Sequence, residues 1–147
     1  MTVKRRPMPD EEAVVRVVAA AVESLLQSRP QMNLDGLLEP WPGPFKFYMG
    51  KYRWAEVDGE MKQLWFSYTI RFQRGFGDLE LLYSPAELSR GKNRGGVWWH
   101  DGQAVSQSEA ERLAGSVFTH PHPVQRVSNK AIKKAEELVD AHKPIDD

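Results

Sequence analysis

Histidine is the residue type best suited to metal binding in this chain, and the sequence holds His100, His120, His122 and His142. His100 precedes Asp101, and two further histidines, His120 and His122, are separated by one proline. Three imidazoles and a carboxylate could bind zinc or another divalent metal. However, a path through alternating prolines is polyproline-like and has threefold symmetry, so the rings of His120 and His122 diverge. No metal-binding spacing such as a helical pair of histidines occurs. We therefore expect no metal site and no cofactor.

Serine, histidine and aspartate are all present, but the G-x-S-x-G turn that exposes a nucleophilic serine is not. A phosphate-binding loop is also missing, because the Gly75-Phe76-Gly77 stretch lacks the later glycine of that motif. The absence of cysteine excludes disulfides, thiolate metal sites and a cysteine nucleophile together. We assign no catalytic residue. An enzyme without a recognisable motif, such as a hydrolase, ranks third among the hypotheses.

Tryptophan and arginine, the side chains that most often dominate protein interfaces, lie close together between positions 90 and 99. Trp98 and Trp99 are adjacent on an expected strand, so they must lie on opposite faces. One can belong to the core, while the other is exposed, covered by a helix or buried in an interface. The basic loop before them would meet an acidic partner and would contribute association rate and specificity more than affinity. The predicted protein-binding residues are Arg90, Lys92, Arg94, Trp98 and Trp99.

The leading hypothesis is therefore a small cytoplasmic adaptor, inhibitor or regulator that binds another protein without catalysis. A nucleic-acid-binding protein is the alternative, because basic residues recur at a strand end, in the same loop and along the last expected helix. Acidic residues share that helix face, however, and a formal net charge of zero is unlike that of a dedicated nucleic-acid binder. The residues of this alternative, besides the loop, are Arg71, Arg74, Arg126, Lys130 and Lys133.

Length and composition indicate one folded domain, since 147 residues with 41% hydrophobic and 27% charged side chains are typical of a globular chain. The 20 basic and 20 acidic residues balance. Acidic residues interrupt the apolar stretch after Lys4-Arg5-Arg6, so we interpret it as neither a secretory signal nor a membrane span. We expect a cytoplasmic protein with a single domain over 1–147 and flexible tails at 1–9 and 143–147.

Apolar periodicity predicts an N-terminal helix over 11–28 that buries one face. Ser106 followed by Glu109 is a capping-box pattern and opens a second helix. A last helix is expected over 124–142, and a short one over 85–90.

Strands are predicted between these helices. Aromatic and β-branched residues over 45–72 are interrupted by Asp58-Gly59, a strong hairpin signal, and a further strand is expected over 79–83. A second hairpin is expected over 97–105 around Asp101-Gly102. The fold class is therefore α+β, with an N-terminal helix, an antiparallel meander of four to five strands and two C-terminal helices packed on one face.

The Asp58-Gly59 turn can form either of two loops, which distribute the aromatic residues differently. A two-residue loop pairs Val57 with Glu60 and leaves aromatic residues on both faces, a platform that needs a partner. A three-residue loop shifts the pairing by one and gathers Tyr48, Tyr52 and other aromatics on a single face. Because each exposed aromatic forgoes roughly 1.5–3 kcal/mol, we favour the three-residue loop and keep the two-residue loop as the alternative.

Overall fold

The computed structural model describes residues 11–29, 31, 45–49, 52–57, 59–65, 68–74, 77–84, 96–119 and 122–141. In these parts of the chain the helices are α1 (Glu11–Ser28), α2 (Gln107–Gly115) and α3 (Asn129–Ala141). The strands are β1 (Phe45–Met49), β2 (Tyr52–Val57), β3 (Glu60–Trp65), β4 (Tyr68–Arg74), β5 (Gly77–Ser84), β6 (Val97–His100) and β7 (Gln103–Val105).

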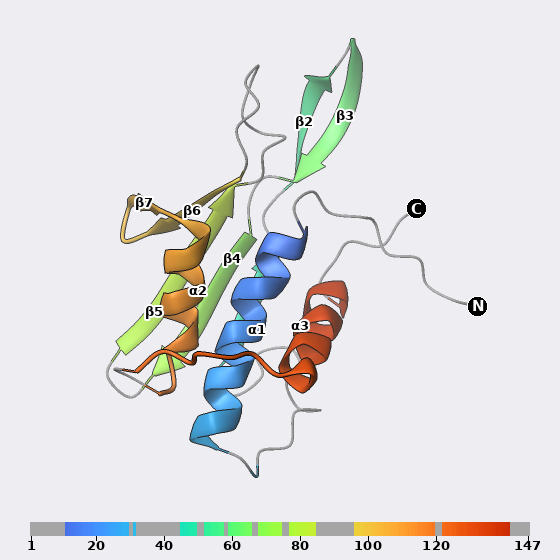
Figure 1. Cartoon of the computed structure of the whole chain (residues 1–147). Helices are drawn as coiled ribbons and strands as arrows, with labels where there is room; N and C mark the ends of the chain where they lie inside the picture. The colour runs from blue at the N-terminus through green and yellow to red at the C-terminus, as the bar shows by residue number, and fades with distance from the viewer. Residues whose placement is uncertain are drawn as a thin grey trace, which may run out of the picture.

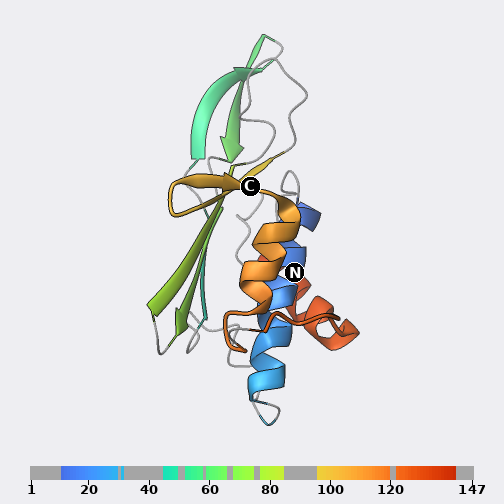
Figure 2. The ribbon, with the colours of Figure 1, turned by 60° about the vertical axis from the view of Figure 1, so that its left-hand side comes forward.

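The fold has two layers, with the helices on one face of an antiparallel sheet (Figures 1 and 2). Within the described residues the strand order of this sheet is β1-β4-β5-β6-β7. We call the face toward the helices the inner face and the opposite one the outer face. The arrangement confirms the predicted α+β class, with an N-terminal helix, an antiparallel sheet and two C-terminal helices.

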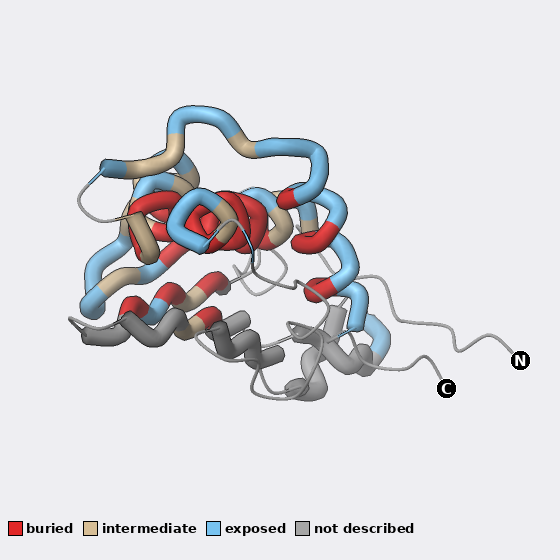
Figure 3. Tube along the Cα trace, turned by 90° about the horizontal axis from the view of Figure 1, so that it is seen from below, coloured by how far each residue is buried: buried red, intermediate tan, exposed pale blue. Residues whose placement is uncertain are grey.

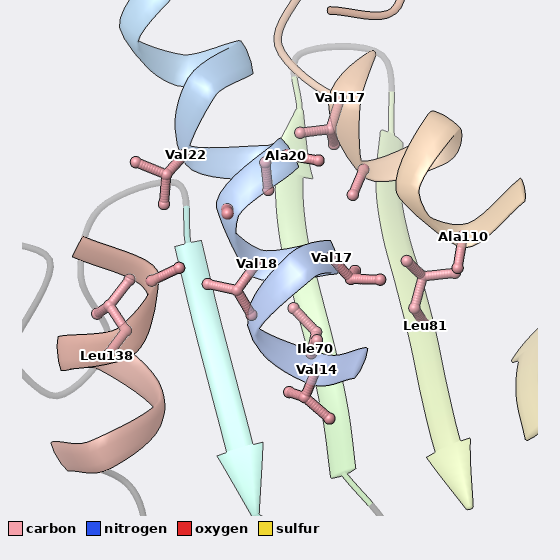
Figure 4. Close-up of a cluster of buried hydrophobic side chains, with 14 of the residues drawn as sticks. Val14, Val17, Val18, Ala20, Val22, Ile70, Leu81, Ala110, Val117 and Leu138 are labelled. Atoms are coloured by element: carbon pink, nitrogen blue, oxygen red, sulfur yellow. The ribbon is translucent and has the colours of Figure 1, made fainter. Parts of the chain in front are cut away.

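α1 is the centre of the helical layer and is buried more completely than its periodicity predicts. Every residue over 17–25 is buried, including three consecutive alanines. Val14 lies over Ile70 of the sheet, while Val18 lies on the side of Leu138 in α3 (Figure 4). α2 packs along the opposite side of α1. The helix therefore buries almost its whole circumference, because small side chains let its neighbours approach closely.

The chain between α2 and α3, which we call the connector, crosses α1 on the side away from the sheet (Figure 3). Two polar residues of α1 are buried, and both bind this connector. The Ser24 hydroxyl accepts a hydrogen bond from the backbone N–H of Phe118 at 2.8 Å. The Glu23 carboxylate accepts one from the backbone N–H of Ser128 at 2.7 Å. Burial raises the pKa of Glu23, but the hydrogen bonds from Ser128 and Gln27 together outweigh this effect, so the pKa lies below its ordinary value.

α2 begins at the predicted N-cap, where the Ser106 hydroxyl accepts a hydrogen bond from the backbone N–H of Glu109 at 3.0 Å. Its first residue, Gln107, links three elements through one side-chain amide. Trp98 Nε1 of β6 donates to the amide oxygen at 2.6 Å, and the amide nitrogen donates to the Ala13 carbonyl of α1 at 3.0 Å. Because Trp98 is buried, Gln107 replaces water as the partner of its indole N–H.

α3 begins later than the predicted 124–142, at Asn129. The residues before it form the connector instead: the Val124 N–H donates to the Gly115 carbonyl at 3.0 Å, and the Ser128 N–H is held by Glu23. The Ser128 hydroxyl then accepts a hydrogen bond from the Ala131 N–H at 3.3 Å, as an N-cap does. The predicted start was wrong because the apolar periodicity of the connector resembles that of the helix it precedes.

The favoured three-residue loop at Asp58-Gly59 is also wrong. Val57 pairs with Glu60, which is the two-residue register, and Gly59 adopts a positive φ of 82°. The same register continues between β1 and β4, where Phe47 pairs with Ile70. The long hairpin is thus one ladder divided into two parts: β1 and β4 join the main sheet, and β2 and β3 form an arm beyond it (Figure 1).

The inner face of the sheet explains why this register is adopted. Ile70 is fully buried against the helices, and the observed pairing gives Phe47 the position beside it. The three-residue loop would have placed Lys46 opposite Ile70, on the side of the helical layer. A lysine at that position would bring an ammonium group toward the buried layer around Ile70, and the observed register avoids this cost.

The second hairpin agrees with its prediction, since β6 and β7 flank Asp101-Gly102 and both turn residues have positive φ, 50° and 78°. This is the type I′ geometry that suits the twist of adjacent strands. The predicted helix over 85–90, the tails over 1–9 and 143–147, and the 90–94 loop lie outside the described residues.

Replacing Gln107 by leucine should lower the free energy of unfolding by about 1–3 kcal/mol, because the buried Trp98 N–H would lose its partner. Urea denaturation measures this. Gln103→Leu is the matched control, since Gln103 is exposed on β7 and its replacement should change stability by no more than about 0.5 kcal/mol. Equal effects of the two variants would contradict the role of the Gln107 amide.

Glu23→Gln should make the protein less stable at neutral pH but not in acid. A carboxylate whose pKa is lowered on folding contributes stability above its unfolded pKa, and this contribution is lost as the pH falls through the folded pKa. The difference in unfolding free energy between wild type and Glu23→Gln should therefore shrink between about pH 5 and pH 3. Denaturant titrations across this range measure it, and a difference independent of pH would refute the interpretation.

Candidate protein interface

The two adjacent tryptophans of β6 lie on opposite faces, and only one of them reaches the surface. Trp98 is 1% exposed on the inner face, and its ring centroid lies 4.6 Å from that of Tyr83. Tyr83 in turn packs so closely on the backbone of Gly96 that a side chain there would overlap its hydroxyl. Trp99 is 36% exposed on the outer face. The sequence left Trp98 and Trp99 both possible as the apolar centre of an interface. Because Trp98 is buried, only Trp99 can contact a partner.

Trp99 lies at a shallow hollow of about 300 Å³ on the outer face. Leu82 is its cross-strand partner on β5, and Ala104 is its partner on β7. Cross-strand partners share a face, so an apolar row crosses three neighbouring strands here. The hollow is lined by Glu80, Leu82, Trp99, Asp101 and Gly102.

The charges around the hollow are mixed. Arg71 of β4 donates from Nε to the Glu80 carboxylate at 3.0 Å, and these residues are direct cross-strand partners. Both side chains are more than one-third exposed, so the ion pair contributes about 1 kcal/mol or less. Asp101, at the tip of the hairpin, lies 3.5 Å from His100 Nε2. This part of the surface thus offers an indole and a leucine with hydrogen-bonding groups on its rim.

The observed register determines which aromatic residues of the long hairpin are paired with which residues across the strands. Tyr48 pairs with Thr69, Thr69 pairs with Leu82, and Leu82 pairs with Trp99, so the four residues form one row across the sheet. Tyr52, four residues after Tyr48, pairs with Trp65 in the arm, four residues before Thr69. The two-residue loop predicts aromatic residues on the face opposite Ile70, and the side chains of Tyr48, Tyr52 and Trp65 lie outside the described parts of the structure.

The structure brings together only part of the predicted protein-binding set. Arg90, Lys92 and Arg94 lie outside the described residues, in the chain between β5 and β6. Leu82, Glu80 and Asp101 were not predicted, although they share the hollow with Trp99. The period of two over 79–83 could have identified Leu82 as an outer-face residue, but its pairing with Trp99 depends on a register that the long connection between the strands hides.

The alternative nucleic-acid-binding set is divided between the two layers. Arg71 lies on the sheet, bound to Glu80, whereas Arg126, Lys130 and Lys133 are exposed on α3 and the connector before it. Arg74 belongs to β4, and its side chain lies outside the described parts of the structure.

The surface of α3 carries both signs of charge. Lys134 lies 2.8 Å from Glu137, and its hydrogen bond lowers the pKa of that carboxyl. Glu136 and Asp140 are exposed on the same helix. A phosphate backbone along α3 would therefore meet carboxylates as well as ammonium groups.

The structure assembles no group of three or more potential metal ligands within the residues it describes. His122 is exposed and His100 is half-buried beside Asp101. None of the described helices is long and apolar enough to cross a membrane. Comparisons with models of protein families, with curated proteins and with solved structures found no match to this chain.

The two tryptophans of β6 should respond very differently to truncation. Trp98→Ala removes a buried indole and should lower the free energy of unfolding by about 3–5 kcal/mol. Trp99→Ala should cost only about 1–2 kcal/mol, since its side chain is partly exposed to solvent. Urea denaturation of the two variants compares them, and similar losses would show that the outer face is covered in the folded protein.

Proposed function

We propose that this protein is a non-enzymatic protein-binding module, an adaptor, inhibitor or regulator, that binds its partner through the outer face of the sheet. The observation that supports this proposal is Trp99, an exposed indole set among Leu82 and Ala104 on the face opposite the helices. An apolar side chain of this size gains most when a partner covers it, and tryptophan is the residue most often found at the energetic centre of an interface.

The surroundings of Trp99 suit a protein partner better than a nucleic acid. The carboxylates of Glu80 and Asp101 line the same hollow and would repel phosphate groups. Arg90, Lys92 and Arg94 belong to the segment that joins β5 to β6, the two strands that carry Leu82 and Trp99. In this proposal the segment meets an acidic area of the partner beside the apolar contact and increases the rate of association.

The test is capture of partners from a nuclease-treated lysate of the source cells, comparing wild type with Trp99→Ala. Loss of a central tryptophan should weaken binding at least about tenfold, because such residues typically contribute 2 kcal/mol or more. Titration of the captured partner, once purified, against both proteins measures the change. Ile132→Ala is the matched control, since Ile132 is also 36% exposed but lies on α3.

The proposal requires that the partner be retained by Ile132→Ala and lost by Trp99→Ala. Binding that both variants weaken equally, or that Trp99→Ala leaves unchanged, would refute the outer face as the interface. A complex that disappears with nuclease and high salt would instead support the nucleic-acid-binding alternative.

A further inference from the structure

A second surface feature lies on the helical layer, where the beginning of α1 meets α3. A cleft of about 450 Å³ is formed between the two helices. Its position is separate from the outer face, because both helices pack on the inner face of the sheet (Figure 2). The residues that line it are Glu11, Glu12, Val15, Arg16, Ile132 and Glu136.

The apolar part of this cleft is formed by Val15 and Ile132. Ile132 is 36% exposed, which makes it, with Trp99, one of two large hydrophobic side chains exposed in the described parts of the chain. The charged residues Lys130, Lys133 and Glu136 of α3 are exposed near Ile132 along the helix. An isoleucine at such a site gains from an apolar cover.

The charged part of the cleft is acidic. Three carboxylates and one guanidinium give its lining a formal charge of −2. Acidic residues in the first turn of a helix are ordinary, because they interact favourably with the helix dipole, and this accounts for Glu11 and Glu12. It does not account for Glu136, which α3 contributes from the other wall.

We propose that this cleft is the docking site of the amino-terminal segment of the same chain, residues 1–10. The segment carries Lys4, Arg5 and Arg6 against one acidic residue, Asp10, a formal charge of +2 that complements the cleft. Val3 and Met8 stand on either side of the basic run and provide apolar side chains for Val15 and Ile132. The Lys4-Arg5-Arg6 run has no part in the proposed outer-face interface, so this inference is independent of the proposed function.

The covalent connection makes a weak contact sufficient. The segment joins α1 at Glu11, which itself lines the cleft, and the basic run lies five to seven residues before it. An extended chain spans at most about 3.3–3.6 Å per residue, so this tether can reach any part of the cleft. Short tethers give effective concentrations in the millimolar range, at which even a millimolar affinity would keep the cleft about half occupied.

The absence of native cysteine allows a direct test on the full-length protein. A nitroxide label attached to Thr2→Cys should broaden the methyl NMR signals of Val15 and Ile132 at low salt. The methyl signals of Leu82, on the outer face, provide the internal reference. At about 1 M salt, where the Debye length falls to about 3 Å, the broadening at Val15 and Ile132 should decrease to the level of an undocked tether.

Charge substitutions then identify the contact. Glu136→Lys and Arg5→Glu should each reduce the docked-to-undocked ratio about two- to fivefold, the range expected for an exposed charge pair. Combining them exchanges the two charges and should restore most of the broadening at Ile132. Glu60→Lys is the matched control, because Glu60 is an exposed carboxylate at the tip of the β2–β3 arm.

Equal relaxation at Ile132 and Leu82 at low salt would overturn the proposal. So would a selective effect that Glu136→Lys leaves unchanged, or that appears only when labelled and unlabelled molecules are mixed, since the latter would come from a second copy. The Glu136 variant alters an exposed side chain on the helical layer, and the Arg5 variant alters the segment itself. Neither touches the outer face, so the outer-face binding assay separates this failure from failure of the proposed function.

Discussion

The enclosure of α1 is the constraint on which the rest of the structure depends. The sheet lies beneath this helix, α2 and α3 lie beside it, and the connector between them crosses above it. Such close approach requires alanine in the middle of the helix and a bonded partner for each polar group that is buried. Phe118 and Ser128 satisfy this requirement by donating their backbone N–H groups to Ser24 and Glu23, which also fixes where the connector runs and where α3 begins.

Much of this architecture was predictable because it is local. The bounds of α1, the cap at Ser106 and the second hairpin follow from apolar periodicity, a hydroxyl at a helix start and a turn dipeptide. The two errors concern choices made by residues far apart in sequence. The start of α3 depends on the bond between Ser128 and Glu23, and the register of the long hairpin depends on the contact of Ile70 with the helical layer.

The candidate interface, too, was predictable only where it depends on local sequence and not where it depends on contacts between distant residues. Alternation along β6 established that Trp98 and Trp99 must separate, but it could not assign which one faces the helices. That assignment follows from the Tyr83 ring and the Gln107 amide, which receive Trp98 from β5 and α2. Leu82, Glu80 and Asp101 join the surface only through the pairing of strands and the turn after β6. The buried tryptophan thus holds the strand in the orientation that presents its neighbour.

The single register shared by both parts of the long hairpin restricts how this protein can change in length. Inserting one residue into a single strand of the arm, with the two-residue turn kept, would shift the pairing of β1 with β4 and place Lys46 opposite Ile70, far from the insertion. Adding the same number of residues to both strands of the arm would leave those pairs intact. The arm can therefore lengthen or shorten only by matched changes on its two sides, and such changes would alter its reach without touching the core.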